Sequence, residues 1–347
     1  MKKSIALLLS ILMIFGIFAA CTDTATDPTE TNIPTDTATE SATDAVTEAS
    51  EADTTDAEPI RVAGMKGPTS IGMVKIMKDN TSTGTYDFTI AGTADEIAPK
   101  LIKGELDIAA VPANLASVLY NKTNGAVSVL AINTLGVLYI VEKGETVQSL
   151  ADLKGKTIYA TGKGTTPEYS LRYLLTQNGI DPDNDVTIEF RSEATEIVSL
   201  LASAENGIAM LPQPYVTVAS QKVEGLRVAV SLNDEWNKLD NGSKLVTGVV
   251  VARNDFIDNN PKAVTDFLDA YKNSVTFVNE NVETAAEYVE EFEIFAAAVA
   301  KKAIPQCNIV FMSDAQMKDA LQAYLTVLHT QNPASIGGAL PGEEFYR

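Results

Sequence analysis

The stretch Tyr159–Leu171, YATGKGTTPEYSL, combines glycine, threonine and lysine in a way that could cradle a phosphate. A nucleotide phosphate loop follows the pattern G-x-x-x-x-G-K-[ST]. Here the lysine of the GKG triplet is followed by Gly164, and Thr157 stands where the first glycine should be. The earlier GKT triplet fails as well, because Leu150 occupies the place of its first glycine. The sequence therefore argues against a nucleotide site.

The same stretch still predicts a surface for a small polar ligand. A helix is expected to begin near Pro167, because proline fits the first helical turn, and Thr165 or Thr166 can cap it. The free backbone N–H groups of such a helix start could bind a polar or anionic group. We expect Gly164, Thr165 and Thr166 to contact a ligand, while the sequence leaves open whether Lys163 points toward it.

Catalytic chemistry finds little support in the residue types. His329 is the only histidine, and it falls in a helical pattern near the C-terminus. The chain has no H-E-x-x-H, G-x-S-x-G or paired C-x-x-C motif. We therefore expect no enzyme, no catalytic residue, no cofactor and no metal site.

The elements that would position a site alternate between strand and helix. Apolar runs that read as strands are each followed by helical patterns, first over residues 60–142 and again over residues 143–246. A further long apolar strand follows over 245–256, and the rest of the chain is mostly helical. Apolar strands without alternation predict parallel sheets covered by helices on both faces. The fold class is therefore α/β, with lobe 1 formed by 60–142 plus 247–347 and lobe 2 by 143–246.

Ligands of open α/β sheets bind outside the carboxyl ends of the strands. The residues at those ends are the candidates for ligand contact. In lobe 1 they are Pro68, Thr69, Ser70, Thr93, Pro112, Ala113, Asn114, Asn133, Thr134 and Gly136. In lobe 2, besides the Gly164–Thr166 loop, they are Glu193, Gln213 and Tyr215, of which the tyrosine could also stack on a flat ring.

Four strings carry a family resemblance: GPTSIGMVKIM, KLIKGELDIAAVPANLA, SLADLKGKTIYATGKGTTPEYSLRYLL and IAMLPQPYVT. They resemble the solute-binding proteins of ABC importers, nearest to the group that binds nitrate, taurine, alkanesulfonates and thiamine precursors. The resemblance implies the two-lobed type-II periplasmic binding protein fold, with two hinge crossings near 142 and 247 and a ligand cleft between the lobes. Gln213 departs from the glutamate that this group often carries, so a cationic ligand is less supported.

The N-terminus predicts export and a lipid anchor. Residues 1–21 have a basic start, an apolar run and Ala19-Ala20 before Cys21, which resembles a bacterial lipobox, although Phe18 departs from its usual leucine or valine. Residues 22–59 hold eleven acidic residues and no basic one, which predicts a disordered, threonine-rich tether. We expect the protein at the outer face of the bacterial cytoplasmic membrane, attached through Cys21.

The charge balance bears on the partners. With 46 acidic and 26 basic residues the chain is strongly acidic, which disfavours nucleic acid. We expect a monomeric receptor that captures a small polar or anionic molecule and delivers it to an ABC permease. The alternatives are an enzyme of a thiamine- or menaquinone-precursor pathway and a lipoprotein that senses its ligand.

Overall fold

A computed structural model describes residues 58–347. The expected signal peptide, the lipidated Cys21 and all but the last two residues of the expected tether lie outside the described residues. Within the described range, no helix is both long enough and apolar enough to cross a bilayer.

The first sheet has six strands in the order β11-β4-β10-β3-β1-β2. They are β1 (Ile60–Met65), β2 (Tyr86–Ala91), β3 (Ile108–Pro112), β4 (Val127–Leu135), β10 (Val246–Arg253) and β11 (Ile309–Met312). β1 pairs in parallel with both β2 and β3, and β10 runs antiparallel between β3 and β4. The parallel strands therefore all end at one edge of this sheet.

The second sheet has five strands in the order β7-β6-β8-β5-β9. They are β5 (Leu138–Lys143), β6 (Thr157–Ala160), β7 (Thr187–Phe190), β8 (Gly207–Pro212) and β9 (Leu226–Ser231). β6 pairs in parallel with β7 and β8, and β5 runs antiparallel between β8 and β9. The two sheets thus repeat one pattern, in which β5 and β10 occupy equivalent places.

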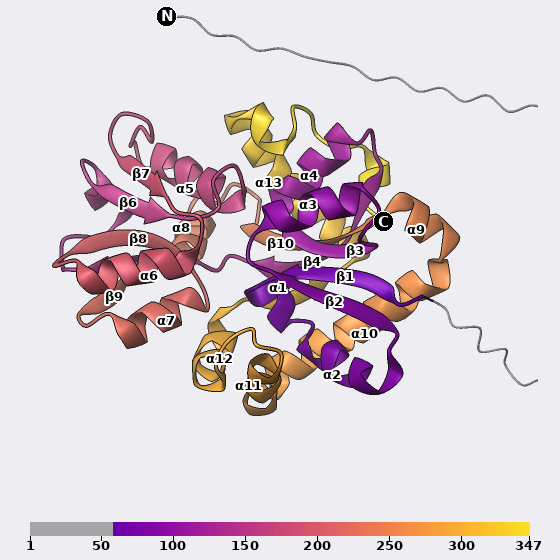
Figure 1. Cartoon of the computed structure of the whole chain (residues 1–347). Helices are drawn as coiled ribbons and strands as arrows, with labels where there is room; N and C mark the ends of the chain where they lie inside the picture. Colours follow the sequence, from indigo (N-terminus) through magenta and orange to yellow (C-terminus); the bar gives the residue numbers. More distant parts are fainter. Residues whose placement is uncertain (1–57) are drawn as a thin grey trace, which may run out of the picture. The chain divides into compact units, whose positions relative to one another are not determined.

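Helices cover both faces of the first sheet, as Figure 1 shows. Alternate residues of β1 and β3 belong to two different apolar cores, which explains why these strands read as continuous apolar runs. The elements of this lobe are α1 (Pro68–Ile71), α2 (Val74–Thr83), α3 (Ala94–Ile102), α4 (Ala113–Lys122), α9 (Asn254–Asn259), α10 (Pro261–Glu280), α11 (Val282–Glu291), α12 (Ala297–Ala303), α13 (Asp314–Gln331) and the short 3-10 turns η2 (Ile304–Gln306), η3 (Pro333–Ile336) and η4 (Glu343–Phe345).

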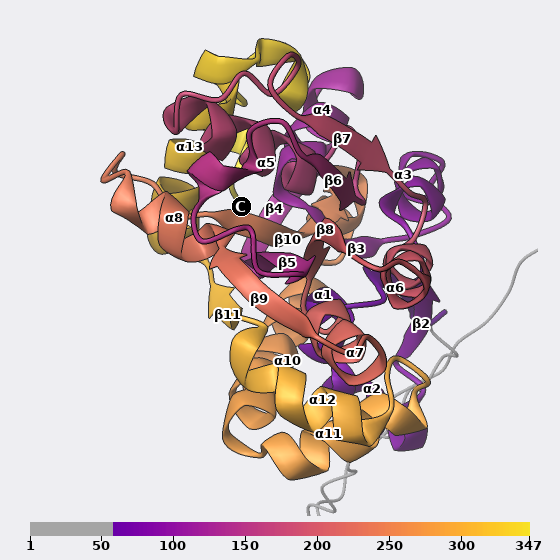
Figure 2. The same ribbon diagram turned by 90° about the vertical axis from the view of Figure 1, so that its left-hand side faces the viewer.

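The second sheet is covered in the same way by its own helices. They are η1 (Leu150–Leu153), α5 (Thr166–Gln177), α6 (Ala194–Ser203), α7 (Tyr215–Lys222) and α8 (Leu232–Lys238). Figure 2 shows that α13 lies beside α5 and α8 on one side of this lobe, and that α12 lies near α7 on the other. The two lobes therefore touch on two flanks as well as at the connecting segments.

An internal repeat underlies the matching sheets. Ala94, Glu96 and Ile97 at the start of α3 recur as Ala194, Glu196 and Ile197 at the start of α6. The tetrapeptide K-G-x-T follows β1 at 66–69 and follows β6 at 163–166, although it also occurs before β6 at 154–157. Each lobe thus places a related loop at the carboxyl edge of its sheet.

The change from the first sheet to the second lies between the end of β4 at Leu135 and the start of β5 at Leu138. We expected this crossing near 142, a few residues later, because the apolar run at 136–143 reads equally well as a strand of either sheet. The return crossing precedes β10 at Val246, close to the expected position of 247. The short helix α9 went unpredicted, because its first residues were read as the end of the strand over 245–256.

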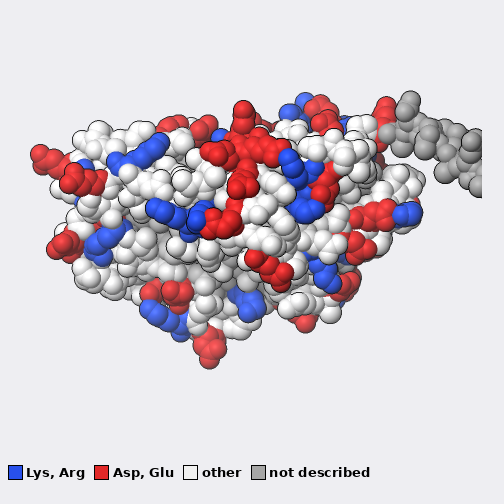
Figure 3. Space-filling view, turned by 90° about the horizontal axis from the view of Figure 1, so that it is seen from below, with Lys and Arg blue, Asp and Glu red and all other residues white. Residues whose placement is uncertain are grey.

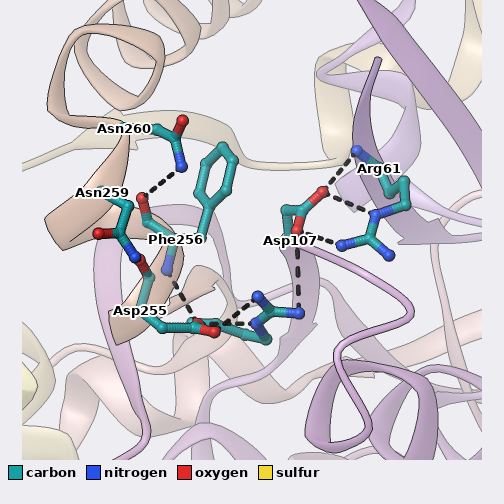
Figure 4. A network of polar contacts seen from close by, with 7 residues as sticks. Arg61, Asp107, Asp255, Phe256, Asn259 and Asn260 are labelled. Atoms are coloured by element: carbon teal, nitrogen blue, oxygen red, sulfur yellow. Dashed lines mark hydrogen bonds and ion pairs between the residues drawn. The ribbon is translucent and has the colours of Figure 1, made fainter. Parts of the chain in front are cut away.

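Charged networks fasten the edges that face away from the strand carboxyl ends. Asp107, directly before β3, accepts hydrogen bonds from Arg61 Nε at 2.9 Å and from a terminal Arg61 nitrogen at 2.6 Å. Arg253 at the end of β10 lies 3.9 Å from the same carboxylate and also binds Asp255 at 2.8 Å (Figure 4). This network joins β1, β3 and β10 at the edge of the sheet that lies opposite the carboxyl ends of β1 and β3.

Candidate functional site

A cleft of about 990 Å³ lies between the two lobes. Its walls come from the loops after β1, β2, β3 and β4 and the start of β10 in the first lobe, and from the loops after β6, β7 and β8 in the second. Val137 and Leu138, in the crossing between the sheets, complete it. The strand carboxyl ends of both sheets therefore converge on one space, as expected for a ligand site in α/β folds.

The structure divides the predicted contact residues into two sets. Those that line the cleft are Pro68, Thr69, Thr93, Pro112, Thr134, Thr165, Glu193, Gln213 and Tyr215. Those that lie outside its lining are Ser70, Ala113, Asn114, Asn133, Gly136, Gly164 and Thr166. Because strand ends were the only guide in the sequence, neighbours on one loop could not be told apart.

Asn114 and Thr166 bind each other instead of facing the cleft. Both are fully buried, and the Thr166 hydroxyl donates to Asn114 Oδ1 at 3.2 Å. Asn114 Nδ2 donates to the Ser335 carbonyl at 2.8 Å and to the Gly164 carbonyl at 3.3 Å. The side chain thus joins α4, the α5 loop and the C-terminal segment, and its amide hydrogens are both used within the protein.

The amino end of α5 offers fewer free donors than we expected. The Gly164 N–H donates to Glu168 Oε2 at 2.7 Å, and the Thr165 N–H donates to the Gly162 carbonyl at 3.0 Å. Pro167 has no N–H at all. The Glu168 carboxylate, which is 11% exposed, is paired with Arg172 at 2.8 Å and does not line the cleft.

Gln213 lines the cleft, but most of its side-chain hydrogen bonds are made to other residues of the protein. It is 1% exposed, and its Oε1 accepts from the Thr217 hydroxyl at 2.9 Å. Its Nε2 donates to Gln306 Oε1 at 2.9 Å. Gln213 consequently ties the second lobe to η2, and it retains one N–H for a ligand.

The inner part of the cleft is built from neutral polar residues on the crossing strands. Thr134 and Thr247 line it, and the hydroxyl of neither has a partner among the described residues. Asn133 does not line the cleft and packs instead against Gly248 of β10. A Cβ added to Gly248 would lie 2.6 Å from Asn133 Oδ1. Thr247 was not predicted, because it is the second residue of the apolar strand β10, whereas the candidates were sought after the ends of strands.

The outer part of the cleft carries charges of both signs. The basic lining residues are Lys66, Lys163 and Arg191, and the acidic ones are Asp95, Glu193 and Glu293. Lys163, whose direction the sequence left open, thus lies on the cleft wall. Arg191 is held by Glu189 at 2.9 Å and lies 5.3 Å from the centre of the Tyr159 ring. Lys66 and Arg191 were not predicted.

Tyr215 supplies an aromatic surface at the amino end of α7. Its ring meets that of Phe295 edge-on, with 5.1 Å between the ring centres. Burial raises the pKa of Tyr215, and the nearby charge of Glu193 raises it further. The side chain therefore stays a neutral phenol that can donate one hydrogen bond or pack against a ring.

Thr93 is a helix cap whose hydroxyl is already engaged. The Glu96 carboxylate accepts from the Thr93 backbone N–H at 2.9 Å and from its hydroxyl at 3.1 Å. Among residues 58–347 no cluster of three histidine, cysteine or acidic side chains is placed to hold a metal ion. Cys307 is fully buried, and burial raises its pKa, which makes it an unreactive thiol.

Comparison with known proteins gives this geometry a context. A family model described as NMT1/THI5 like matches residues 124–285. A putative binding protein of Brucella abortus (strain 2308) is 27% identical over 174 residues, which is 50% of this chain and 52% of the relative. The chain therefore spans about half the length of the curated relatives that it matches.

Solved structures match over a larger share of the chain. An ABC transporter protein from Parabacteroides distasonis superposes with a TM-score of 0.70 at 25% identity, covering 84% of this chain and 99% of that one. The periplasmic aliphatic sulphonate binding protein of Escherichia coli has a TM-score of 0.65 at 15% identity, covering 84% and 92%. The periplasmic nitrate-binding protein of Synechocystis PCC 6803 has a TM-score of 0.58 at 15% identity, covering 80% and 82%.

These structural neighbours are binding proteins rather than enzymes. The predicted two-lobed α/β class is confirmed by the two sheets and by the superpositions. Residues 124–285 thus match the NMT1/THI5-like family model, and the chain has the two-lobed fold of these solved binding proteins.

Proposed function

We propose that the protein is the extracytoplasmic solute-binding receptor of an ABC importer, and that it captures a small polar or anionic molecule between its lobes. The observation that carries the proposal is the cleft itself, where the strand carboxyl ends of two equivalent sheets face each other. Two crossing segments connect these sheets, which is the arrangement of proteins that close by hinge motion. The lobes given by the sheets, with crossings at 136–137 and just before Val246, are the bodies that would move.

The predicted anchor and partner complete the proposal. The lipobox-like Cys21 would hold the receptor at the outer face of the cytoplasmic membrane, and the acidic tether would let it reach a permease. Delivery requires that the ligand favour the closed form, because a ligand shifts an equilibrium only by its differential affinity. The face in Figure 3 has acidic and basic side chains interspersed, with acidic ones gathered near its middle, which suits a protein partner better than nucleic acid.

Binding is tested with a variant that fills the cleft without straining the fold. Gly67 lines the cleft, has an extended φ of 163°, and a Cβ built on it meets nothing within 4 Å. Compounds that co-purify with residues 60–347 are identified by mass spectrometry and returned in thermal-shift assays beside nitrate, methanesulfonate, taurine and cytosine. A compound at about 100 times its Kd should stabilise the wild type by about 2.7 kcal/mol.

The Gly67→Phe variant should keep its ligand-free Tm and lose this stabilisation, because the ring occupies the cleft. The matched control is Gly342→Phe, on the exposed surface near η4, where φ is −76° and the nearest atom to an added Cβ is the Tyr120 hydroxyl at 3.7 Å. It should bind like the wild type. A compound that stabilises wild type and Gly67→Phe equally would place its site outside the cleft.

A further inference from the structure

We propose that Glu293 is a specificity-determining residue of the cleft, whose carboxylate binds a ligand group that carries N–H donors, such as an ammonium or an amino substituent. The inference rests on the proposed function and narrows its ligand class. It concerns the loop between α11 and α12, which follows a helix and was therefore not among the candidates sought after strand ends.

The first observation is where this loop lies. Phe292 and Glu293 line the cleft, and the Phe295 ring meets the Tyr215 ring of the second lobe with 5.1 Å between the ring centres. Figure 2 shows α12, which follows the loop, near α7 of the second lobe. Ile294 is fully buried in an apolar core of the first lobe. The loop is therefore held from both lobes, and it presents Glu293 to the space between them.

The second observation is the backbone of Glu293, which has a φ of 55°. Glycine adopts this left-handed region without steric cost, and asparagine and aspartate tolerate it better than other residues do. The other non-glycine residues of the described chain with a positive φ are Asn124, Asp240, Asn308 and Asp314. None of these four lines the cleft. The residue type least suited to this conformation is thus the one whose side chain reaches the cleft.

The third observation is what stands at the same place in other helices. α11 ends with the Ile294 N–H donating to the Val289 carbonyl at 3.0 Å, around a left-handed Glu293. Glycine is the favoured residue at the left-handed position of such an ending. Four other elements, α3, α4, α5 and η3, end with the same bond, and their left-handed residues are Gly104, Asn124, Gly179 and Gly337. Glutamate costs stability here, and backbone strain that persists at a binding cleft points to a use of the side chain.

The fourth observation is that the protein itself does not use this carboxylate. Glu291 and Glu283 of α11 pair with Lys78 and Lys301 at 2.7 Å and 2.6 Å. Within residues 58–347, by contrast, Glu293 has neither an ion pair nor a side-chain hydrogen bond. A carboxylate can only accept hydrogen bonds, and the strongest ones come from positively charged N–H donors. The chemical complement of Glu293 is therefore an amine-like group of the ligand.

The test compares pairs of probes that differ in one polar group. Taurine and isethionate share a sulfonate, but the first carries an ammonium and the second a hydroxyl. Cytosine and pyrimidin-2-one share a ring, and only cytosine has the exocyclic amino group. Kd values for all four are measured by calorimetric titration with the wild type, Glu293→Gln and Glu293→Gly. We expect the wild type to prefer the nitrogen-bearing member of at least one pair by about tenfold or more, and both variants to lose that preference.

A second measurement separates ligand contact from a merely structural role. Glu293→Gly relieves the strained backbone, so its ligand-free Tm should rise by about 1–2 °C while the preference is lost. Asn124→Gly changes the equivalent position of α4 outside the cleft, and Glu287→Gln removes a charge from the exposed side of α11. Both controls should leave every Kd within about twofold of wild type, since neither residue lines the cleft.

Three results would overturn the inference. The wild type could bind none of the four probes or show no preference for the nitrogen-bearing member, the preference could persist in both Glu293 variants, or both members of a pair could lose affinity alike. A co-purifying compound that lacks N–H donors, binds the wild type and fails to bind Gly67→Phe would sustain the proposed function while refuting the role of Glu293. The two proposals can therefore fail separately.

Discussion

Asn114 and Thr166 show how polar residues near a binding cleft can serve the protein rather than the ligand. They come from different lobes, both are inaccessible to solvent, and their side chains bind each other. Close by, Ser170 and Tyr324 also join the lobes through their hydroxyls at 3.1 Å. Burial raises the pKa of Tyr324 to about 12, against the opposing effect of hydrogen bonds with Ser170 and Thr166, so it remains a neutral partner.

Replacing Thr166 with valine should destabilise the protein by about 1–3 kcal/mol, because it leaves the buried Asn114 carbonyl oxygen without its donor. Urea unfolding can be followed by the fluorescence of Trp236, the only tryptophan, which is fully buried. Thr161→Val is the matched control, since Thr161 lies half-buried on the cleft wall. Equal losses in the two variants would show that the inter-lobe bond adds no stability.

At the scale of elements, α8 of the second lobe packs against the first lobe through Trp236. Trp236 lies between Tyr173 of α5 and Tyr324 of α13, with ring centres 4.9 Å and 5.4 Å away. Its Nε1 donates to the Ser243 hydroxyl at 3.0 Å. The connection between β4 and β5 passes directly against α8. A Cβ added to Gly136 would lie only 2.4 Å from Asn233 Oδ1, so no side chain fits there.

Gly136→Ala should therefore cost about 1–3 kcal/mol, the usual range for overpacking, since the new methyl group would collide with Asn233. The backbone of Gly136 is not left-handed, so strain in φ does not contribute. Gly342→Ala, where an added Cβ finds only an ordinary contact at 3.7 Å, should change stability by less than about 0.5 kcal/mol. Thermal unfolding of the two variants beside wild type measures the difference, and matching Tm values would refute the packing argument.

The sequence could predict the elements that have long apolar patterns, and it could place their carboxyl ends together. It could not fix the bounds of α8 or β11, because these are short and are stabilised by contacts with distant segments such as α13 and β4. For the same reason it could not separate Thr69, which lines the cleft, from Asn114, whose amide binds Ser335 far along the chain. Side-chain pairing across hundreds of residues leaves no local signal.

At the scale of the whole molecule, buried carboxylates fasten each sheet on the side away from the cleft. Asp107 does so in the first lobe, and Glu142 near the end of β5 does so in the second. Glu142 is 2% exposed and binds Arg227 and the Val147 N–H. Burial by itself raises the pKa of Glu142, but hydrogen bonds from Thr146, Val147 and Arg227 outweigh it and hold the pKa below its ordinary value of 4.5.

This lowered pKa predicts how stability responds to acid. The unfolded chain takes up the proton at a higher pH than the native protein does, so the contribution of Glu142 is present above pH 4.5 and is lost as the pH falls through the native pKa. Glu142→Gln should be less stable than wild type at pH 7, and the gap should narrow below pH 4.5. Urea titrations across this range test it, and a gap that does not change with pH would contradict it.

The exchange of strands between the sheets has a consequence for biosynthesis. The second sheet has all its strands once Ser231 has emerged, whereas the first lacks β10 until Val246 and the residues after it are made. Until then β3 and β4 have no partner between them, and their open edges are sites for aggregation. The lobe encoded later can thus fold first, and the lobe that begins the chain must wait for it.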